Sequence, residues 1–390
     1  MWRAFESPGP RDAWFTGGLR LPFAKAQGAY RDIRPDDLLV ALLRGARNAN
    51  PELWQGPYED FLVGCAYPEG EQGYNIARMS ALGAGLDCPG LTLNRLCGSS
   101  LEAVASAAAR VRSGWNRALL VGGVESMSRI PRRGASFSPS EGIRSRAAQA
   151  YISMGETAEE VARRYPHLSR AAQEEFAARS HERADEAYRQ GHYDSQLLPL
   201  DLARDESLRV PVKREKMASL APAFDPAGVV TAATSSPMSD GASCGWVLSR
   251  AAAAQSGLSA LRILDVAWSE VAPEVMGLGP IGSMTQLFQR HALHPRDIAA
   301  FEINEAFAVQ VLAVVESLAL EMDKVNAWGG ALALGHPLGA SGLRLMMTLH
   351  HRLEALGQPG ALGMTSLCIG GGQGMALLCE YWPAASLAAA

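Results

Sequence analysis

Residues 91–105 read LTLNRLCGSSLEAVA, and this stretch contains the transition that decides the fold. An apolar run comes first, and a turn that holds Cys97 and Gly98 follows it. A helix is predicted over residues 99–112, because apolar residues recur there at spacings of three and four. Many small residues in that helix indicate that it can be buried. A strand that leads into a buried helix is typical of an α/β fold.

Apolar β-like runs alternate with helical patterns elsewhere along the chain. They lie at residues 61–65, 91–93, 118–121, 247–248 and 261–266. Between residues 128 and 227 charged residues become more frequent and such runs become rare, which indicates an inserted domain. Residues 169–190 in this segment show the pattern of an exposed amphipathic helix.

The two parts that flank the inserted segment show a faint similarity. Near Cys97 a turn of small residues opens a helix, and an apolar strand follows; near His336 a comparable turn and helix precede a strand that ends at Cys368. We therefore predict two similar α/β halves. The predicted segments are 1–127 with 228–258 for the N-terminal half, 128–227 for the inserted loop domain, and 259–390 for the C-terminal half.

The composition of the 390 residues is that of a globular protein, with 48% hydrophobic and 19% charged residues. A net charge of −4, with lysine and arginine scattered along the chain, argues against nucleic acid as the main partner. No apolar run approaches the roughly 18 residues that a membrane helix needs, so we expect no membrane span. Residues 1–12 lack the pattern of a secretory signal, and we infer a cytoplasmic location.

Two of the six cysteines stand out by their surroundings, although most are expected to be buried structural thiols. Cys97 lies where a helix begins, and a helix N-terminus is expected to lower the pKa of a thiol. Cys368 stands beside three consecutive glycines, whose backbone N–H groups, that of Gly370 among them, can form an oxyanion hole. The alternatives are a buried cysteine at a strand end and a flexible loop. None of the six forms a CxxC pair, so no metal site is expected.

Two further side chains complete a candidate catalytic group. His336 lies between Gly335 and Pro337, in a rigid turn that suits an imidazole aimed at a thiol. A cysteine with a histidine is the minimum for an activated thiolate. Asn304 follows an apolar strand, where it can orient a water molecule or polarise a carbonyl.

Five signatures in these segments resemble the thiolase family over nearly all of the chain from about residue 17. They are NRLCGSS at 94–100, GGVESMS at 122–128, NEAFA at 304–308, GGALALGHPLGASGLR at 329–344 and CIGGGQGMA at 368–376. The resemblance implies duplicated α/β halves with an inserted loop domain, in a five-layered αβαβα arrangement. It is strongest to the degradative 3-oxoacyl-CoA thiolases of fatty-acid β-oxidation, including the β-subunits of oxidation complexes.

The resemblance also implies the reaction and the residues that perform it. A 3-oxoacyl-CoA is cleaved by a second CoA to acetyl-CoA and a shortened acyl-CoA. Cys97 takes the acyl group, His336 activates its thiol, and Cys368 exchanges a proton with the acetyl enolate. Asn304 holds a water in one oxyanion hole, and the backbone N–H groups of Cys97 and Gly370 form the other.

The family pattern assigns residues of this chain to substrate binding as well. Ser236 matches a serine that touches the pantetheine part of CoA, although Pro237 follows where a small residue is usual. Three apolar residues match the lining of the acyl and pantetheine tunnel: Met154, Met276 and Phe307. Short-chain enzymes tend to have histidine where this chain has Ser153, which favours longer or broader acyl chains. CoA enters as a substrate, and no permanently bound cofactor is expected.

Two segments depart from the family pattern. The first strand reads WFTGGLRLP at residues 14–22, so Arg20 and Pro22 are kept but the strand is weakly apolar and its pairing is open. The loop domain is short and basic near Arg209, Lys213, Arg214 and Lys216. These cations either meet CoA phosphates or form a solvated loop.

Partners and competing functions follow from the same resemblance. A homodimer or homotetramer is expected, and an α-subunit of a β-oxidation complex is a possible partner. One alternative is an acetoacetyl-CoA thiolase that works in the biosynthetic direction. Another is a non-catalytic, thiolase-like lipid carrier, which Asn304, Cys97, His336 and Cys368 together argue against. A ketoacyl synthase would pair the cysteine with two histidines, whereas this chain offers Asn304 and Cys368.

Overall fold

A mixed sheet of ten strands organises this computed structural model, which describes residues 8–49, 51–54 and 58–389. The strand order is β4-β3-β5-β6-β1-β7-β10-β9-β8, and β2 pairs with β6. The bounds are β1 Ala13–Arg20, β2 Ala24–Lys25, β3 Phe61–Gly64, β4 Gly90–Leu93, β5 Ala118–Ser126, β6 Ser239–Ser249, β7 Ala260–Glu270, β8 Ala300–Ile303, β9 Leu362–Ile369 and β10 Gln373–Trp382. Residues 1–7 and 390, at the two ends of the predicted segments, lie outside the described residues. Residues 1–7 make up most of the stretch in which no secretory signal is expected.

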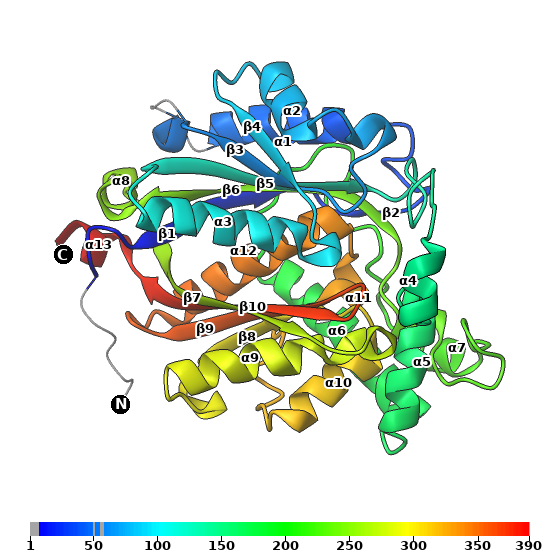
Figure 1. The fold of residues 1–390 in the computed structure, drawn as a ribbon. Coiled ribbons are helices and arrows are strands. Elements are labelled where there is room, and N and C mark those ends of the chain that lie inside the picture. The colour runs from blue at the N-terminus through cyan, green and yellow to red at the C-terminus, as the bar shows by residue number, and fades with distance from the viewer. Residues whose placement is uncertain (1–7, 50, 55–57, 390) are drawn as a thin grey trace.

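Helices cover both outer faces and fill the space between the two halves of the sheet (Figure 1). Helices α1 (Pro35–Ala49) and α2 (Ile76–Ala84) lie on one outside, and α9 (Gly279–Arg290) and α10 (Ala308–Ser317) on the other. Helices α3 (Ser99–Arg112) and α12 (Leu338–Leu356) pack together in the middle. Three buried clusters fill the spaces between the layers, and the central one contacts both halves of the sheet. The arrangement is the predicted five-layered αβαβα fold.

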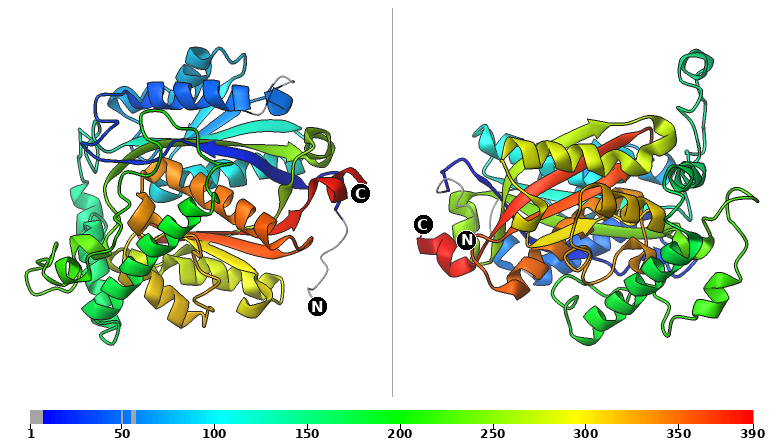
Figure 2. Two further views of the ribbon diagram at one scale, coloured as in Figure 1. Left: turned by 180° about the vertical axis from the view of Figure 1, so that it is seen from behind. Right: turned by 90° about the horizontal axis from the view of Figure 1, so that it is seen from below.

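Residues 128–227 contribute helices to the described chain and no strand of the sheet. These helices are α4 Glu141–Arg146, α5 Met154–Arg164, α6 Arg170–Arg189 and α7 Arg214–Ala218. Figure 2 shows them on one side of the layered body. The other short elements are α8 Arg250–Ser256, α11 Ala331–Leu334, α13 Ala384–Ala389 and the 3-10 turns at Pro51–Trp54, Gly70–Gln72, Leu96–Gly98, Ala232–Thr234, Pro273–Leu278 and Pro295–Asp297. The boundaries of the three predicted segments remain a prediction.

The two halves repeat one topology. In the first half α3 leads into β5, which is parallel to β3 and antiparallel to β6. In the second half α12 leads into β9, which is parallel to β8 and antiparallel to β10. This correspondence confirms the predicted duplication and places the starts of α3 and α12 at equivalent points.

The weakly apolar first strand joins the halves. β1 pairs with β6 and with β7, and its register shifts between Thr16 and Leu19. Trp14 and Phe15 are fully buried, one on the α1 side of the sheet and the other against the central helices. Arg20 donates to both carboxylate oxygens of Asp205, at 2.7 and 2.9 Å, which ties β1 to the inserted segment.

Glycines let the starts of α3 and α12 approach the sheet and each other. A Cβ on Gly123 of β5 would lie 2.3 Å from the carbonyl oxygen of Gly339 in α12. A Cβ on Gly342 would lie 2.4 Å from the backbone nitrogen of Leu101 in α3. Both distances are shorter than any van der Waals contact, so any larger residue would push the two helix starts apart.

We therefore expect Gly123→Ala to reduce the free energy of unfolding by about 1–3 kcal/mol, the usual cost of overpacking a core. The measurement is urea unfolding followed by circular dichroism. Gly142→Ala is the matched control, because a Cβ there would lie 3.7 Å from its nearest neighbour in the exposed helix α4. Equal stability of the two variants would contradict the close contact.

Candidate active site

One cavity of about 740 Å³ brings the predicted site residues together. Of the predicted residues it is lined by Cys97, His336, Cys368, Gly370, Ser236, Met154, Met276 and Phe307. Asn304 is fully buried behind this surface and contacts His336. Residues that are more than 200 positions apart in the sequence therefore meet at one place.

Cys97 sits in the turn between β4 and α3. Its predecessor Leu96 has a φ of 46°, a left-handed conformation that a branched side chain rarely adopts. The turn is held by hydrogen bonds: Leu96 N–H donates to Asn94 Oδ1 at 2.8 Å, and Ser99 Oγ donates to the Leu96 carbonyl at 2.6 Å. Backbone strain of this kind gathers at functional sites. Here it fixes the thiol at the cavity wall.

The pKa of Cys97 differs from the expectation. Burial raises the pKa of the thiol to about 11, the negative charge of Glu125 adds to the rise, and the backbone N–H groups of Gly370 and of Cys97 itself lower it. The backbone N–H groups lower this pKa, as expected at a helix start, but desolvation outweighs them, so the predicted net lowering is wrong. Cys97 rests as a thiol and needs a base.

His336 has the protonation state that such a base requires. Its Nδ1 lies 2.6 Å from Ser341 Oγ, and that hydroxyl donates its own hydrogen to the Pro337 carbonyl at 2.9 Å. Ser341 therefore accepts from Nδ1–H, which leaves Nε2 without a proton. Burial, with a smaller contribution from the charge of Arg344, lowers the pKa of His336 to about 3. The imidazole is neutral at physiological pH.

Asn304 is held against Nε2 of His336 by a buried ion-pair network. Arg344 donates to Asn304 Oδ1 at 3.4 Å, so the amide group of Asn304 faces Nε2, at 3.2 Å. Arg344 also pairs with Glu302 at 3.5 Å, and Arg352 pairs with the same carboxylate at 2.7 Å. An arginine has only donors, which fixes the orientation of the amide.

Cys368 is the last but one residue of β9, lines the same cavity and is buried. Burial, with the negative charge of a Cys97 thiolate, raises the pKa of Cys368 well above the usual thiol value. Cys368 therefore keeps its proton when Cys97 loses one. The N–H of Gly370, two residues on, points at the Cys97 sulfur. A carbonyl oxygen bound at Cys97 would lie near that donor.

The sequence did not single out Glu125, which holds the backbone next to the site in place through hydrogen bonds. The carboxylate is buried and accepts from Gln72 Nε2 at 2.7 Å, Ala66 N–H at 2.8 Å and Gly339 N–H at 3.0 Å. Burial raises the pKa of Glu125 to about 7, while these donors act against the rise. The signal was present in the GGVESMS signature, as a carboxylate at the end of an otherwise apolar strand.

A second wall of the cavity comes from the inserted segment and the residues after β8. Ser236 N–H donates to the Ala306 carbonyl at 2.9 Å, and the rings of Phe224 and Phe307 meet edge to face at 6.0 Å. Met154, at the start of α5, lines the same surface. Phe224 was not predicted, because a single aromatic residue in a loop has no distinguishing pattern.

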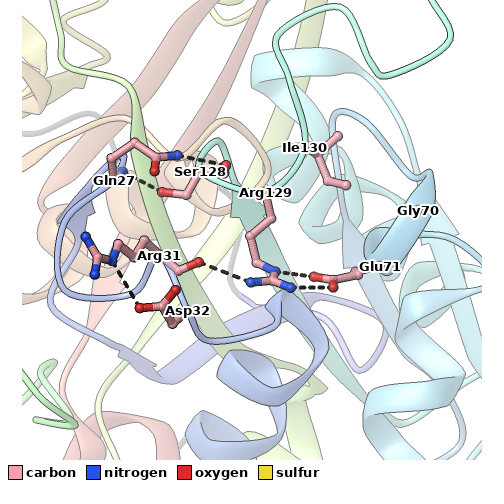
Figure 3. Close-up of a pocket in the computed structure, with 8 residues that line it drawn as sticks. All are labelled: Gln27, Arg31, Asp32, Gly70, Glu71, Ser128, Arg129 and Ile130. Carbon is pink, nitrogen blue, oxygen red and sulfur yellow. Dashed lines mark hydrogen bonds and ion pairs between the residues drawn. The ribbon is translucent and has the colours of Figure 1, made fainter.

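The basic residues of the inserted segment lie elsewhere. Arg209, Lys213, Arg214 and Lys216 do not line the cavity, and Arg214 pairs with Glu182 at 2.6 Å and with Glu175 at 3.2 Å. Arg132 and Arg133 line it instead. A smaller cavity of about 510 Å³ (Figure 3) holds none of the predicted residues.

Within the described part of the chain, no group of three or more His, Cys, Asp or Glu side chains is arranged to hold a metal ion. No helix among the described residues has the length and apolarity needed to cross a membrane.

Comparison with known proteins agrees with this geometry. Two family models match the chain, the thiolase N-terminal domain over residues 15–251 and the thiolase C-terminal domain over residues 259–381. The 3-ketoacyl-CoA thiolase of Bacillus subtilis is 36% identical over 94% of this chain and 98% of its own length. The enzyme of the same name from Vibrio cholerae is 41% identical over 93% and 97%.

Solved structures give the same result. The dimeric peroxisomal thiolase of Saccharomyces cerevisiae matches with a TM-score of 0.86 and 32% identity, over 96% of this chain and 99% of that one. Human mitochondrial 3-ketoacyl-CoA thiolase in complex with CoA matches with a TM-score of 0.85 and 30% identity, over 95% and 98%.

The raised pKa of Cys97 predicts how the rate of its alkylation depends on pH. The rate at which iodoacetamide modifies Cys97 should rise about tenfold per pH unit from pH 6 to pH 10, because the thiolate fraction grows in that proportion below the pKa. Mass spectrometry of the tryptic peptide that contains Cys97 measures the rate, and glutathione, with an ordinary thiol pKa of about 8.5, is the reference. A plateau near pH 7 would contradict the raised pKa.

Proposed function

The chain belongs to the thiolase family, and on that premise we propose that it cleaves 3-oxoacyl-CoA with a second CoA through an acyl-enzyme on Cys97. It is an acyltransferase. One observation supports the assignment of roles above all others. Two thiols that hold their protons, Cys97 and Cys368, line one cavity with an imidazole whose Nε2 carries no proton.

The first half of the reaction breaks the carbon–carbon bond. Cys97 gives its proton to Nε2 of His336 while its sulfur attacks the 3-oxo carbon. The tetrahedral oxyanion is stabilised by the N–H groups of Cys97 and Gly370, and it collapses as the bond between C2 and C3 breaks. Cys368 then protonates C2, and acetyl-CoA leaves. The enolate oxygen is stabilised by His336 and by a water molecule that Asn304 holds.

The second half transfers the acyl group to CoA. The Cys368 thiolate takes the proton of the incoming CoA thiol, whose sulfur attacks the thioester on Cys97. The shortened acyl-CoA leaves, and the proton on His336 returns to the Cys97 sulfur. A thioester is exchanged for a thioester, so each bond formed is close in energy to the bond broken. The proton count of the enzyme is the same at the end as at the start.

Ser236, Met154, Met276 and Phe307 are proposed to hold the pantetheine arm and the acyl chain along the second wall. We further propose work in fatty-acid β-oxidation in the cytoplasm, as a homodimer or homotetramer. The CoA-bound human neighbour supports the binding of CoA, and the dimeric yeast neighbour supports the homodimer. The condensation direction and a non-catalytic lipid carrier are not favoured, since the relatives are named 3-ketoacyl-CoA thiolases and the catalytic group is complete.

Removing each thiol should produce a different defect. Cys368→Ala keeps Cys97 and its backbone donors, so transfer of label from radiolabelled acetyl-CoA to the protein should survive. Cleavage of acetoacetyl-CoA should fall by about 10²–10⁴-fold, the usual effect of a lost acid or base. Cys97→Ala should lose both activities.

Cys379→Ala is the control, because Cys379 is also fully buried but does not line the cavity. It should keep both activities. If Cys368→Ala loses the label as completely as Cys97→Ala, the proposed division of roles is wrong. If the unaltered protein cleaves no 3-oxoacyl-CoA at all, the proposed function itself fails.

A further inference from the structure

The catalytic cavity has unbalanced positive charge. Arg132 and Arg133 line it, whereas no aspartate or glutamate is among the described residues that do. The smaller cavity in Figure 3 is the contrast: there Arg129 pairs with Glu71 at 2.6 Å, and Arg31 pairs with Asp32 at 3.0 Å. In that cavity the positive charges are neutralised by the protein. In the catalytic cavity they face the space that a substrate enters.

Arg133 is held in place by contacts that leave its charge available. Its guanidinium donates to the Tyr151 carbonyl at 2.9 Å and lies over the ring of Phe137, 5.1 Å from the ring centre. Both partners also line the cavity. Arg132, its neighbour, makes no ion pair with any described carboxylate that would neutralise it. Two adjacent guanidinium groups with five donors each can bind a planar anion at two oxygens.

Tyr67 connects the arginines to the nucleophile. Its side chain lines the cavity with Cys97, and the backbone N–H of Arg133 lies close enough to its hydroxyl to lower the pKa. Burial raises the pKa of Tyr67, and the charges of a Cys97 thiolate and of Arg132 both act on the same hydroxyl. The backbone of Arg133 therefore lies next to a residue that shares the cavity wall with the nucleophile, and the charge of Arg132 acts on that same residue.

The position of Arg132 and Arg133 decides which anionic group of the substrate they bind. The phosphates of CoA are separated from its sulfur by the whole pantetheine arm, and the wall assigned to that arm is built by Met154, Ser236 and Phe307. The acyl chain begins at the carbon bound to Cys97, and the cavity that it enters is lined by Tyr67 and Arg133 as well as by the second wall. An anionic group on the acyl chain is thus the group within reach.

We propose that the acyl chain of the preferred substrate ends in a carboxylate, which Arg132 and Arg133 bind. This inference rests on the proposed thiolase function and names its substrate class: CoA thioesters of 3-oxo dicarboxylic acids. Both arginine side chains are exposed, so the attraction comes from charge-assisted hydrogen bonds to the carboxylate. A fatty acyl chain with a methyl end would offer neither charge a partner.

The test uses two CoA thioesters of equal length, 3-oxohexanoyl-CoA and its counterpart with a terminal carboxylate, 3-oxoadipyl-CoA. The unaltered protein should cleave the carboxylate form with the higher kcat/KM. Arg132→Gln should lower the ratio of the two kcat/KM values at least about tenfold, as expected for the loss of a charge-assisted hydrogen bond. Arg132→Glu should reverse the preference. Arg146→Gln removes an exposed arginine of α4 outside the cavity and should leave the ratio unchanged.

Three results would overturn the inference. The first is preference of the unaltered protein for the methyl-ended substrate, which leaves the thiolase function intact. The second is that Arg132→Gln lowers kcat/KM equally for both substrates and raises the KM for CoA. That result would assign the arginines to the CoA phosphates. The third is no change in the ratio in either Arg132 variant. Cleavage of neither substrate by the unaltered protein would instead count against the proposed function.

Discussion

The site depends on the close contact between the starts of α3 and α12. Gly123 and Gly342 have no side chains at the points where the two helices meet the sheet and each other. Leu343 N–H donates to Ser100 Oγ at 3.1 Å across this contact. Because Cys97 lies two residues before the start of α3 and His336 two residues before the start of α12, the contact brings nucleophile and base to one cavity. The duplicated topology explains why two equivalent helix starts are available to meet there.

Burial at this contact sets the electrostatics. Desolvation raises the pKa of Cys97 and lowers that of His336, so the pair rests as a neutral thiol and a neutral imidazole. Hydrogen bonds then decide where protons sit: Ser341 takes the hydrogen of Nδ1, and Arg344, through Asn304, keeps an amide donor against Nε2. Charge separates only when the sulfur attacks a substrate carbonyl, where backbone N–H groups can receive the oxyanion.

The architecture was largely predictable because apolar runs and helical spacing are local signals. The helix over residues 99–112 was predicted with its observed bounds, and the strands near residues 61, 91, 118 and 261 were found. The pairing of β1 was not predictable, since it depends on partners more than 200 residues away. Cys97, His336, Cys368 and Asn304 stood out through glycine-rich turns and a polar residue at a strand end.

Properties that arise only from burial and proximity could not be read from the sequence. The direction of the Cys97 pKa shift was wrong, because a helix start is visible in the sequence and the depth of burial is not. Arg132 and Arg133 were not singled out within the charged inserted segment, whereas the basic residues near 214 were left open between a phosphate site and a solvated loop. The fold places the first pair in the cavity and pairs Arg214 with glutamates.

The most direct test of this account is the protonation state of His336 in the resting protein. Nitrogen NMR of protein labelled with ¹⁵N-histidine distinguishes a protonated from an unprotonated ring nitrogen, and the spectrum of His336→Asn assigns the signals among the eight histidines. The account predicts a neutral ring at pH 7 with its hydrogen on Nδ1, which persists on acidification for as long as the protein stays folded. An imidazolium at pH 7, with both nitrogens protonated beside a Cys97 thiolate, would contradict it.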